Sequence, residues 1–284
     1  MNFPLILTCA VFVSGAIWLF DRIVWRPSRL EVQSAWQKRN AGLPLDLAAN
    51  PELAPPLLVE YAGSFFPVLF VVLFLRSFLV EPYQIPSGSM RPTLEVGDFI
   101  LVNKYIYGVR LPVVGTKIID MGEPARGDVM VFVPKHRDEY FIKRVIGLPG
   151  DKIAYKNKVL YINNERLSYE FSRAIEGYNA ASGRRETIRE YTEQIGGVAH
   201  PIWRYERPEQ AQEWQVPDGH YFMMGDNRGN SRDSRAWARG DANNAPDPGL
   251  AFVPEANIVG RAFAIWMHMP GWSVPSFERN QKIR

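Results

Sequence analysis

Two serine hydroxyls lie close together in a short segment whose residue types restrict the backbone. The segment runs from Gln84 to Leu94 and reads QIPSGSMRPTL. Proline fixes φ, and glycine admits dihedral angles that other residues avoid. Such a turn would hold Ser89 rigidly, as a nucleophile requires, because a displacement of about 1 Å can lower a rate roughly a hundredfold. The same residue types dominate ordinary turns, so this segment alone does not identify a nucleophile.

A serine nucleophile needs a base, and one lysine has a suitable context. Lys143 lies in a strand pattern from Tyr140 to Ile146, in which Phe141, Lys143 and Val145 share one face. Burial among apolar neighbours disfavours the charged form of an amine and lowers its pKa. A neutral Lys143 could then accept the proton of Ser89. The alternative is a lysine at a strand edge whose amine reaches water.

The chain also contains four histidines: His136, His200, His220 and His268. None has a sequence context that distinguishes it, and Ser89 does not lie in a Gly-x-Ser-x-Gly motif. A Ser/His/Asp triad therefore remains open, but no motif supports it.

A third polar segment spans residues 225–235 and reads GDNRGNSRDSR. It is superficially similar to a calcium-binding loop. However, Arg228 stands at the third position, where an oxygen ligand is required, and no glutamate stands at the twelfth. The segment could instead form Asp–Arg bridges and offer a serine hydroxyl to a buried amine. A solvated run of charges is the ordinary alternative.

Composition bounds the class of protein. The chain has 284 residues, of which 46% are hydrophobic, which is enough for a sizeable core. The net charge is only +3 and the basic residues are dispersed, which excludes a typical nucleic-acid-binding surface. The only cysteine, Cys9, excludes an internal disulfide and a cysteine-based metal site.

Two apolar segments near the start of the chain predict membrane spans. Residues Phe3 to Phe20 carry no charge and are long enough to cross a bilayer. A cleaved signal peptide is the alternative, but no basic side chain precedes Asp21, where such peptides carry positive charge. The second segment, from Leu57 to Leu75, also suits a span, although its uncharged centre would fit a buried core helix as well.

The charges predict the orientation of these spans. The polar segment between them, which we expect to be a loop with one short helix, contains five Lys and Arg residues, so it should face the cytoplasm. We therefore predict a first span at 1–22, a cytoplasmic loop at 23–56, a second span at 57–76 and an extracytoplasmic domain at 77–284. Ser89 would lie close to the membrane surface.

The outer domain is predicted to be mostly β, either an antiparallel β-sheet or a partly open barrel. Short runs rich in Val, Ile, Phe and Tyr predict strands, with a hairpin turn at 156–158. These strands are expected at 99–105, 128–133, 140–146, 152–155, 159–162, 220–224 and 257–267. Residues 170–215 are more polar and lack a clear pattern, so we expect a surface excursion with marginal strands there.

The three motifs together resemble bacterial type I signal peptidase. Ser-Gly-Ser-Met-x-Pro-Thr-Leu after an apolar segment is followed by Lys-Arg-Val-Ile-Gly-Leu-Pro-Gly-Asp and then by Gly-Asp-Asn-Arg-x-Asn-Ser-x-Asp-Ser-Arg. Their order and spacing also agree. The resemblance covers nearly the whole chain and is closest to the two-span enzymes of Gram-negative bacteria. Residues 236–249 are longer than the usual passage, and we expect an exposed loop there.

The resemblance implies a role for each matching residue. Ser89 would be the nucleophile and Lys143 the general base of a Ser/Lys dyad. Ser87 would complete the oxyanion hole together with the N–H of Ser89, and Ser231 would orient the lysine amine. The residues implied as structural support are Asp233, Arg144 and Arg235. The residues expected to line the substrate pocket are Tyr83, Ile85, Pro86, Met90, Leu94, Phe141 and Ile142; their apolar character would equally suit core packing.

The implied activity is removal of signal peptides from exported preproteins, with cleavage after small residues at Ala-x-Ala sites. The resemblance further implies an enzyme of the bacterial inner membrane, with its catalytic domain in the periplasm, that meets phospholipid and the protein export machinery and needs no metal or cofactor. Trp266 and Trp272 are candidate anchors at the bilayer surface. Two other hypotheses are a relative specialised in another substrate, as in self-cleaving repressors, and a membrane-tethered binding module without turnover.

Overall fold

The computed structural model describes residues 3–40, 45–110, 117–179, 184–240 and 245–283. The chain divides into two compact units. The first comprises residues 1–79 with 110–116, and the second comprises residues 80–109 with 117–284. The three sequence motifs, at residues 84–94, 143–151 and 225–235, all lie in the second unit. The candidate catalytic residues therefore belong to that unit alone.

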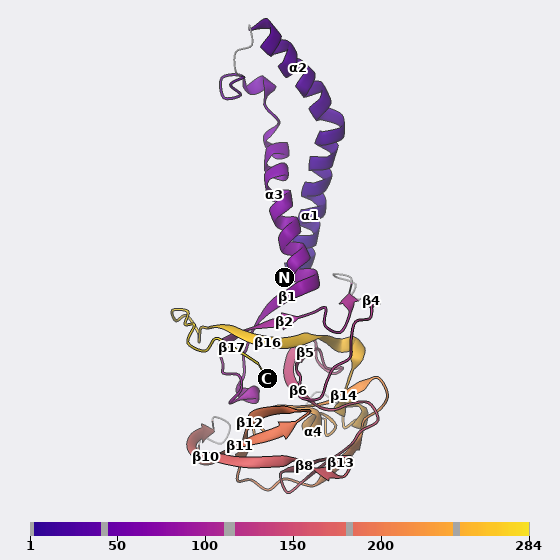
Figure 1. Ribbon diagram of the computed structural model, residues 1–284, viewed down its shortest axis with the longest axis vertical. Helices are drawn as coiled ribbons and strands as arrows, with labels where there is room; N and C mark the ends of the chain where they lie inside the picture. Colours follow the sequence, from indigo (N-terminus) through magenta and orange to yellow (C-terminus); the bar gives the residue numbers. More distant parts are fainter. Residues whose placement is uncertain (1–2, 41–44, 111–116, 180–183, 241–244, 284) are drawn as a thin grey trace. The chain divides into compact units, whose positions relative to one another are not determined.

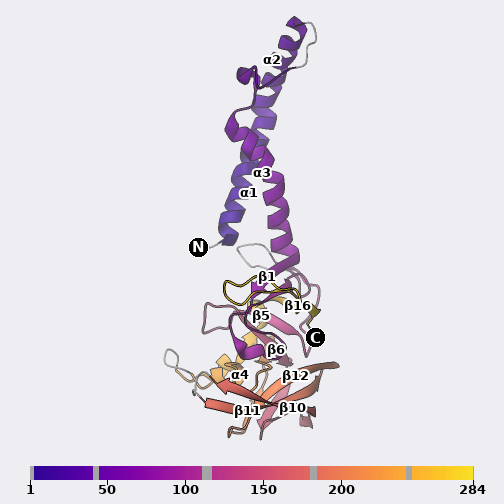
Figure 2. The ribbon, with the colours of Figure 1, turned by 90° about the vertical axis from the view of Figure 1, so that its left-hand side faces the viewer.

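The first unit contains two helical segments that lie side by side (Figures 1 and 2). α1 (Phe3–Phe20) continues through a π-helical turn, Asp21–Trp25, into α2 (Arg26–Arg39). α3 (Leu57–Phe74) follows a 3₁₀ turn at Pro51–Leu53 and ends in a π-helical turn, Leu75–Leu79. Trp18 stacks on Phe66 of α3 with ring centroids 5.5 Å apart. Gly15 permits this approach, because a Cβ there would lie 2.7 Å from the Phe66 ring.

The helical segments at 5–39 and 57–77 are both long and apolar enough to cross a membrane, which agrees with the two predicted spans. The polar residues after Phe20 form more helix than the sequence suggests, since helix continues as far as Arg39. Two features explain this continuation. No proline or glycine occurs between residues 28 and 39, and Arg29 donates two hydrogen bonds, of 2.9 and 3.0 Å, to the Asp21 carboxylate across the π-helical turn.

The second unit is built mainly from antiparallel sheets (Figure 1). The largest has the strand order β1-β2-β16-β5-β6-β14-β15, with β17 paired to β16. Its strands are β1 (Val80–Gln84), β2 (Asp98–Asn103), β5 (Val129–Phe132), β6 (Phe141–Gly147), β14 (His220–Met224), β15 (Phe252–Pro254), β16 (Ile258–His268) and β17 (Gln281–Lys282). The sheets are open and do not close into a barrel, so the predicted mostly β fold is confirmed in its open form.

A second sheet has the order β13-β7-β8-β9. Its strands are β7 (Lys152–Lys156), β8 (Val159–Ile162), β9 (Glu165–Arg166) and β13 (Gln212–Gln215). The predicted hairpin is confirmed: Asn157 and Lys158 form a two-residue turn, both with positive φ, as a type I′ hairpin turn requires. Two short strands, β3 (Val109–Arg110) and β4 (Lys117–Ile119), lie between β2 and β5 in the chain.

Residues 168–179 and 184–205 contribute a third sheet, where the sequence predicts a polar surface excursion with marginal strands. β10 (Ser168–Asn179), β11 (Arg184–Ile195) and β12 (Val198–Tyr205) pair in that order. Their outer faces are polar, and a few buried apolar side chains, including Ile188, Ile195 and Ile202, fix the other face. The expectation of marginal strands here is therefore wrong.

The segment after the third motif is exposed at residues 239 and 245–249, as its sequence predicts, but its start is not. α4 (Ser234–Trp237) begins it, and Trp237 is only 3% exposed. The Trp237 ring packs edge-on against Phe132 and Phe141. Part of the predicted loop, residues 241–244, lies outside the described residues.

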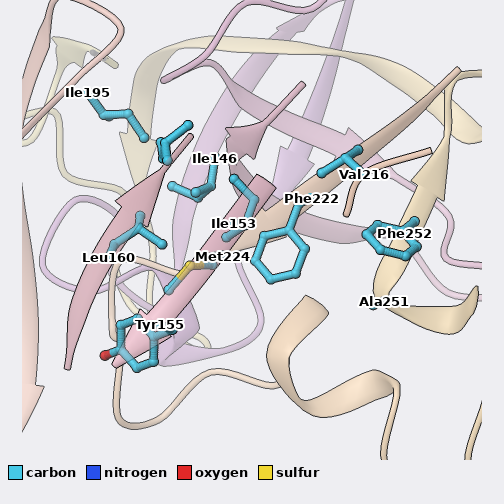
Figure 3. Close-up of a cluster of buried hydrophobic side chains, with 11 residues drawn as sticks. Ile146, Ile153, Tyr155, Leu160, Ile195, Val216, Phe222, Met224, Ala251 and Phe252 are labelled. Carbon is cyan, nitrogen blue, oxygen red and sulfur yellow. The ribbon is translucent and has the colours of Figure 1, made fainter. Parts of the chain in front are cut away.

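Three apolar clusters hold the second unit together. One joins the large sheet to the β7–β8 hairpin, and Figure 3 shows Phe222, Met224 and Ile153 gathered in it. The other two lie on opposite faces of β5, where Val129 and Val131 pack on one face and Met130 and Phe132 on the other. Because both faces of β5 and its neighbour β6 are covered, a polar side chain on β6 must lie in a poorly hydrated environment.

Candidate active site

The Ser-Gly-Ser segment forms a tight turn anchored in the apolar core. Residues Gly88–Met90 make a single 3₁₀ turn after β1. Ile85 and Met90 are buried on either side of it. The N–H of Ile85 donates to the carbonyl of Asp98 at 2.8 Å, and the N–H of Gly97 donates to the carbonyl of Ile85 at 2.9 Å. Ser89 is therefore carried on a turn whose two flanks are fixed.

Lys143 lies on the central strand β6 and reaches this turn. Its side chain is buried, with 4% of the residue exposed. Nζ lies 2.7 Å from Oγ of Ser89, within hydrogen-bonding distance, and donates to the carbonyl of Ile142 at 2.9 Å. The geometry thus joins two residues that are 54 positions apart in the sequence.

Burial changes the proton affinity of this amine. Removal from water lowers the pKa of Lys143 from 10.5 to about 8, and the carboxylates of Asp233 and Asp226 oppose that shift. A substantial fraction of the amine is then neutral near physiological pH, and a neutral amine can accept a proton from an adjacent hydroxyl.

The other two candidate hydroxyls lie in the same region. Oγ of Ser87 is 3.4 Å from Oγ of Ser89 and is exposed to the cleft. Oγ of Ser231 is buried and makes no hydrogen bond of normal geometry in the described structure. Ser231 packs against Gly225, where a Cβ would lie 2.2 Å from the Ser231 hydroxyl and 2.4 Å from the carbonyl oxygen of Ser89. Glycine at 225 is what allows these groups to approach.

Two buried ion pairs lie near Lys143, and each includes a carboxylate that acts on its amine. Arg144 donates to both carboxylate oxygens of Asp226, at 2.9 and 2.7 Å, and both side chains are fully buried. Arg235 makes a similar two-point contact with Asp233, at 2.9 and 2.8 Å. Burial alone would raise the pKa of each carboxyl, but the neighbouring guanidinium groups lower the pKa of both below its usual value.

These residues surround an open cleft of about 630 Å³. The cleft is lined by Ile85, Pro86, Ser87, Gly88, Ser89, Met90, Glu139, Tyr140, Phe141, Ile142, Lys143, Gly229, Asn230, Ser231, Arg232 and Ala236. Two residues expected in the lining lie elsewhere. Leu94 is fully buried in the core, and Tyr83 packs edge-on against Tyr140 with ring centroids 5.3 Å apart.

The four histidines have other surroundings in the described structure. The His136 ring packs on Trp237, and Nε2 of His220 lies 3.3 Å from Nζ of Lys135. Nδ1 of His268 lies 2.7 Å from Oδ1 of Asp98. His200 is buried, with Nε2 3.2 Å from the Glu193 carboxylate. None of these contacts, in the part of the chain that the structure describes, joins a histidine to Ser89.

Several residues at the site were not singled out by the sequence. Thr93 donates to the Asp226 carboxylate at 2.5 Å, and Asn227 donates to the carbonyl of Gly88 at 2.9 Å. Both residues lie inside motifs that the sequence analysis recognised. The sequence therefore pointed to these two positions, but not to the groups with which they bond. Glu193 and His200 lie outside every motif and had no such signal.

A serine hydroxyl within hydrogen-bonding distance of a buried amine, in the lining of an open cleft, is compatible with a hydrolase that uses serine as its nucleophile. Comparison with known proteins makes the class specific. Residues 58–267 match the family model described as "Signal peptidase, peptidase S26". The chain belongs to this family and is a serine protease that removes signal peptides.

Sequence similarity to known signal peptidases extends over nearly the whole chain. The chain is 49% identical over 290 residues to a signal peptidase I of Pseudomonas aeruginosa, covering 98% of each. It is 35% identical over 321 residues to one from Haemophilus influenzae, covering 94% of this chain and 86% of the relative. A crystal structure of a signal peptidase I from Enterococcus faecalis covers 49% of this chain at 28% identity, with a TM-score of 0.30. Family membership makes the protein an enzyme, so the hypothesis of a silent binding module is set aside.

Proposed function

We propose that Ser89 and Lys143 form a catalytic dyad that cleaves preproteins after small residues, at Ala-x-Ala sites. The observation that carries the proposal is the 2.7 Å approach of Nζ of Lys143 to Oγ of Ser89 within a poorly hydrated site. Such a contact lets the amine take the hydroxyl proton as the oxygen attacks.

Each step then balances within the site. Neutral Lys143 accepts the Ser89 proton while Oγ bonds to the scissile carbonyl carbon, and the negative oxygen that results is bound by the N–H of Ser89 and the hydroxyl of Ser87. The lysinium returns its proton to the leaving amine as the C–N bond breaks, which gives an acyl-enzyme. Water then donates a proton to Lys143 and attacks the ester carbon; the lysinium returns that proton to Oγ of Ser89 as the ester C–O bond breaks, which releases the carboxylic acid product and restores the hydroxyl of Ser89 and neutral Lys143.

The lining of the cleft supports a preference for small side chains. Ile85, Met90, Phe141 and Ile142 supply an apolar surface beside the dyad. Apolar contacts admit an alanine methyl group readily, and a pocket already filled by such side chains excludes larger ones. Asp233, Arg144 and Arg235 would hold this arrangement without touching the substrate, and Ser231, which lines the cleft, would orient the lysine amine.

Cleavage of a purified preprotein with an Ala-x-Ala site tests the proposal. The full chain in detergent should cut after the second alanine, whereas Ser89→Ala and Lys143→Ala, with folding verified by circular dichroism, should not cut. Near-normal cleavage by Lys143→Ala would assign the base to another group. Cleavage with no preference for alanine at the −1 position would contradict the proposed specificity.

The same proposal places residues 23–56 in the cytoplasm and residues 77–284 in the periplasm, where preproteins and the export machinery meet the bilayer. The five Lys and Arg residues between the two apolar helices support this orientation. In a Cys9→Ser background, a membrane-impermeant maleimide applied from the periplasmic side should label Ser172→Cys but not Ser34→Cys. The reverse pattern would invert the topology.

A further inference from the structure

The sheet β10-β11-β12 lies outside the three sequence motifs, yet its last strand is bonded to the third motif. The N–H of Trp203 donates to the carbonyl of Asp226 at 2.9 Å, and the N–H of Arg228 donates to the carbonyl of Trp203 at 2.9 Å. Trp203 thereby faces Asn227 in a parallel bridge. The start of the motif is held beside β12 by this isolated β-bridge.

Side chains strengthen this junction. A Cβ on Gly229 would lie 2.3 Å from the ring of Tyr205, so the loop and β12 are in direct contact there. The carboxylate of Glu193 in β11 accepts hydrogen bonds from both terminal nitrogens of Arg228, one of them at 2.7 Å. Glu193 is fully buried and Arg228 is 2% exposed. Nε2 of His200 lies 3.2 Å from the Glu193 carboxylate and 3.7 Å from that of Asp226.

A buried ion pair of this kind constrains position. Isolated charges are rarely buried, because removal from water is costly unless a partner is held in good geometry. Arg228 can therefore leave Glu193 only at a large penalty, and its backbone is fixed at the same place by the bond to Trp203. The loop of residues 225–229 is thus tied to the sheet at both backbone and side chain.

The same loop holds the turn that carries Ser89. Nδ2 of Asn227 donates to the carbonyl of Gly88 at 2.9 Å, and the N–H of Asn227 donates to the carbonyl of Ser89 at 3.1 Å. Asn227 is 1% exposed. Because a peptide group is planar, fixing the carbonyl of Gly88 also fixes the direction of the N–H of Ser89, which belongs to the same peptide group.

We propose that Glu193, Arg228 and Asn227 are positioning residues, through which the β10–β12 sheet sets the orientation of the Ser89 N–H and hydroxyl. This inference rests on the proposed role of Ser89 as the nucleophile. It gives the third sheet a part in the reaction, although no described residue of its three strands lines the cleft. The effect should appear in the chemical step, because the contacts orient the reacting groups and leave the apolar lining of the cleft unchanged.

Two variants test the connection at its two ends. Asn227→Ala removes the bond to Gly88, and a paired variant, Glu193→Leu with Arg228→Met, removes the ion pair without leaving one charge buried alone. The matched control is Glu186→Gln, which breaks a partly exposed pair with Arg207 at the far end of the same strand. All are made in the full chain in detergent, and the active fraction is measured by titration with an acylating serine reagent.

We expect kcat per active enzyme to fall about tenfold to a hundredfold in both variants, with KM changed less than about twofold. Combining Asn227→Ala with the paired variant should add little to either alone, because both break one line of contacts. The control should retain the wild-type kcat. Wild-type kcat per active enzyme in both variants would overturn the proposal, and so would a loss that only follows the active fraction.

Ser89→Ala in the same series separates the two hypotheses. If Ser89→Ala is inactive while the positioning variants behave as wild type, only the role of the sheet is wrong. If Ser89→Ala still cleaves at a normal rate, the nucleophile is wrong, and this inference falls with it.

Discussion

Protonation of Lys143 is expected to control the rate of cleavage. Burial lowers its pKa to about 8, and only the neutral amine can accept the Ser89 proton. With that pKa, about one tenth of the enzyme is active at pH 7 and about nine tenths at pH 9. The value of kcat/KM should therefore rise roughly eight- to tenfold between pH 7 and pH 9 and become nearly constant above pH 9.

The same shift predicts a stability effect with a definite sign. The folded pKa of Lys143 lies below its unfolded value of 10.5, so between pH 8 and 10.5 the folded chain binds fewer protons than the unfolded chain. Stability rises with pH across that window, and below pH 8 the full cost of the depressed pKa is present. A shift of this size corresponds to about 3 kcal/mol. Lys143→Met, which is inactive but carries no charge, should be more stable than wild type at pH 7.

Two measurements check this reasoning. Initial rates on an Ala-x-Ala peptide between pH 6 and 10 give the kinetic pKa, and thermal unfolding at pH 7 and pH 10 gives the stability difference between wild type and Lys143→Met. That difference should be several degrees at pH 7 and shrink toward pH 10. Lys152→Met, at an exposed lysine, serves as the control and should show no such trend. A kinetic pKa near 6.5 would indicate a histidine base, and one near 10.5 would show that the amine is not desolvated.

Three substitutions address the surroundings of the dyad. Gly225→Ala should lower kcat/KM at least about a hundredfold, because its methyl group would lie 2.2 Å from the Ser231 hydroxyl. Ser87→Ala should lower kcat about a hundred- to thousandfold with KM little changed, as loss of one oxyanion donor does. Trp237→Leu should raise cleavage after Val relative to Ala at the −1 position about tenfold, because Trp237 packs behind Phe141, with ring centroids 5.8 Å apart, and Phe141 lines the cleft. Kinetics on matched peptides measure all three.

Each substitution has a counterpart elsewhere in the fold. Gly249→Ala, at an exposed glycine whose closest contact would be 3.1 Å, should be nearly neutral. Trp214→Leu removes a ring that packs on Phe222 at 4.7 Å, away from the cleft, and should leave the −1 preference unchanged. Equal changes in specificity for both tryptophan variants would reduce the role of Trp237 to general stability. Unchanged kcat in Ser87→Ala would remove Ser87 from the oxyanion hole.

The strands that the sequence predicts well are those with strong apolar runs. β5, β6 and β14 are buried almost throughout, so Val, Ile, Phe and Met mark them directly. The pairing of Ser89 with Lys143 was predicted from the resemblance carried by the three motifs, because the strand pattern alone left open a lysine whose amine reaches water. Its distance of 2.7 Å could not be predicted, because it depends on how the turn seats on the core.

The strands β10 and β11 escape prediction for a physical reason. Charged and polar residues are spread through both strands without a regular alternation of apolar and polar positions, and most of the described side chains of β10 are exposed. Backbone hydrogen bonds pair the two strands along nearly their whole length, while only a few apolar side chains of β11, such as Ile188 and Ile195, are buried. A method that reads hydrophobic pattern finds little there. The same limit hid Trp237, whose neighbours in the sequence are polar or small while its neighbours in space are aromatic.

Glu193 shows where the limit becomes functional. In the sequence it is one of several acidic residues in a polar strand, and nothing distinguishes it from Glu190 or Glu186. In the structure it is fully buried and paired with Arg228, 35 residues later. The partner, not the residue, decides whether a carboxylate is solvated or part of the catalytic framework, because a buried carboxylate without a cation would be too unstable to persist. A sequence motif can therefore contain the groups that react and still omit the groups that hold them in place.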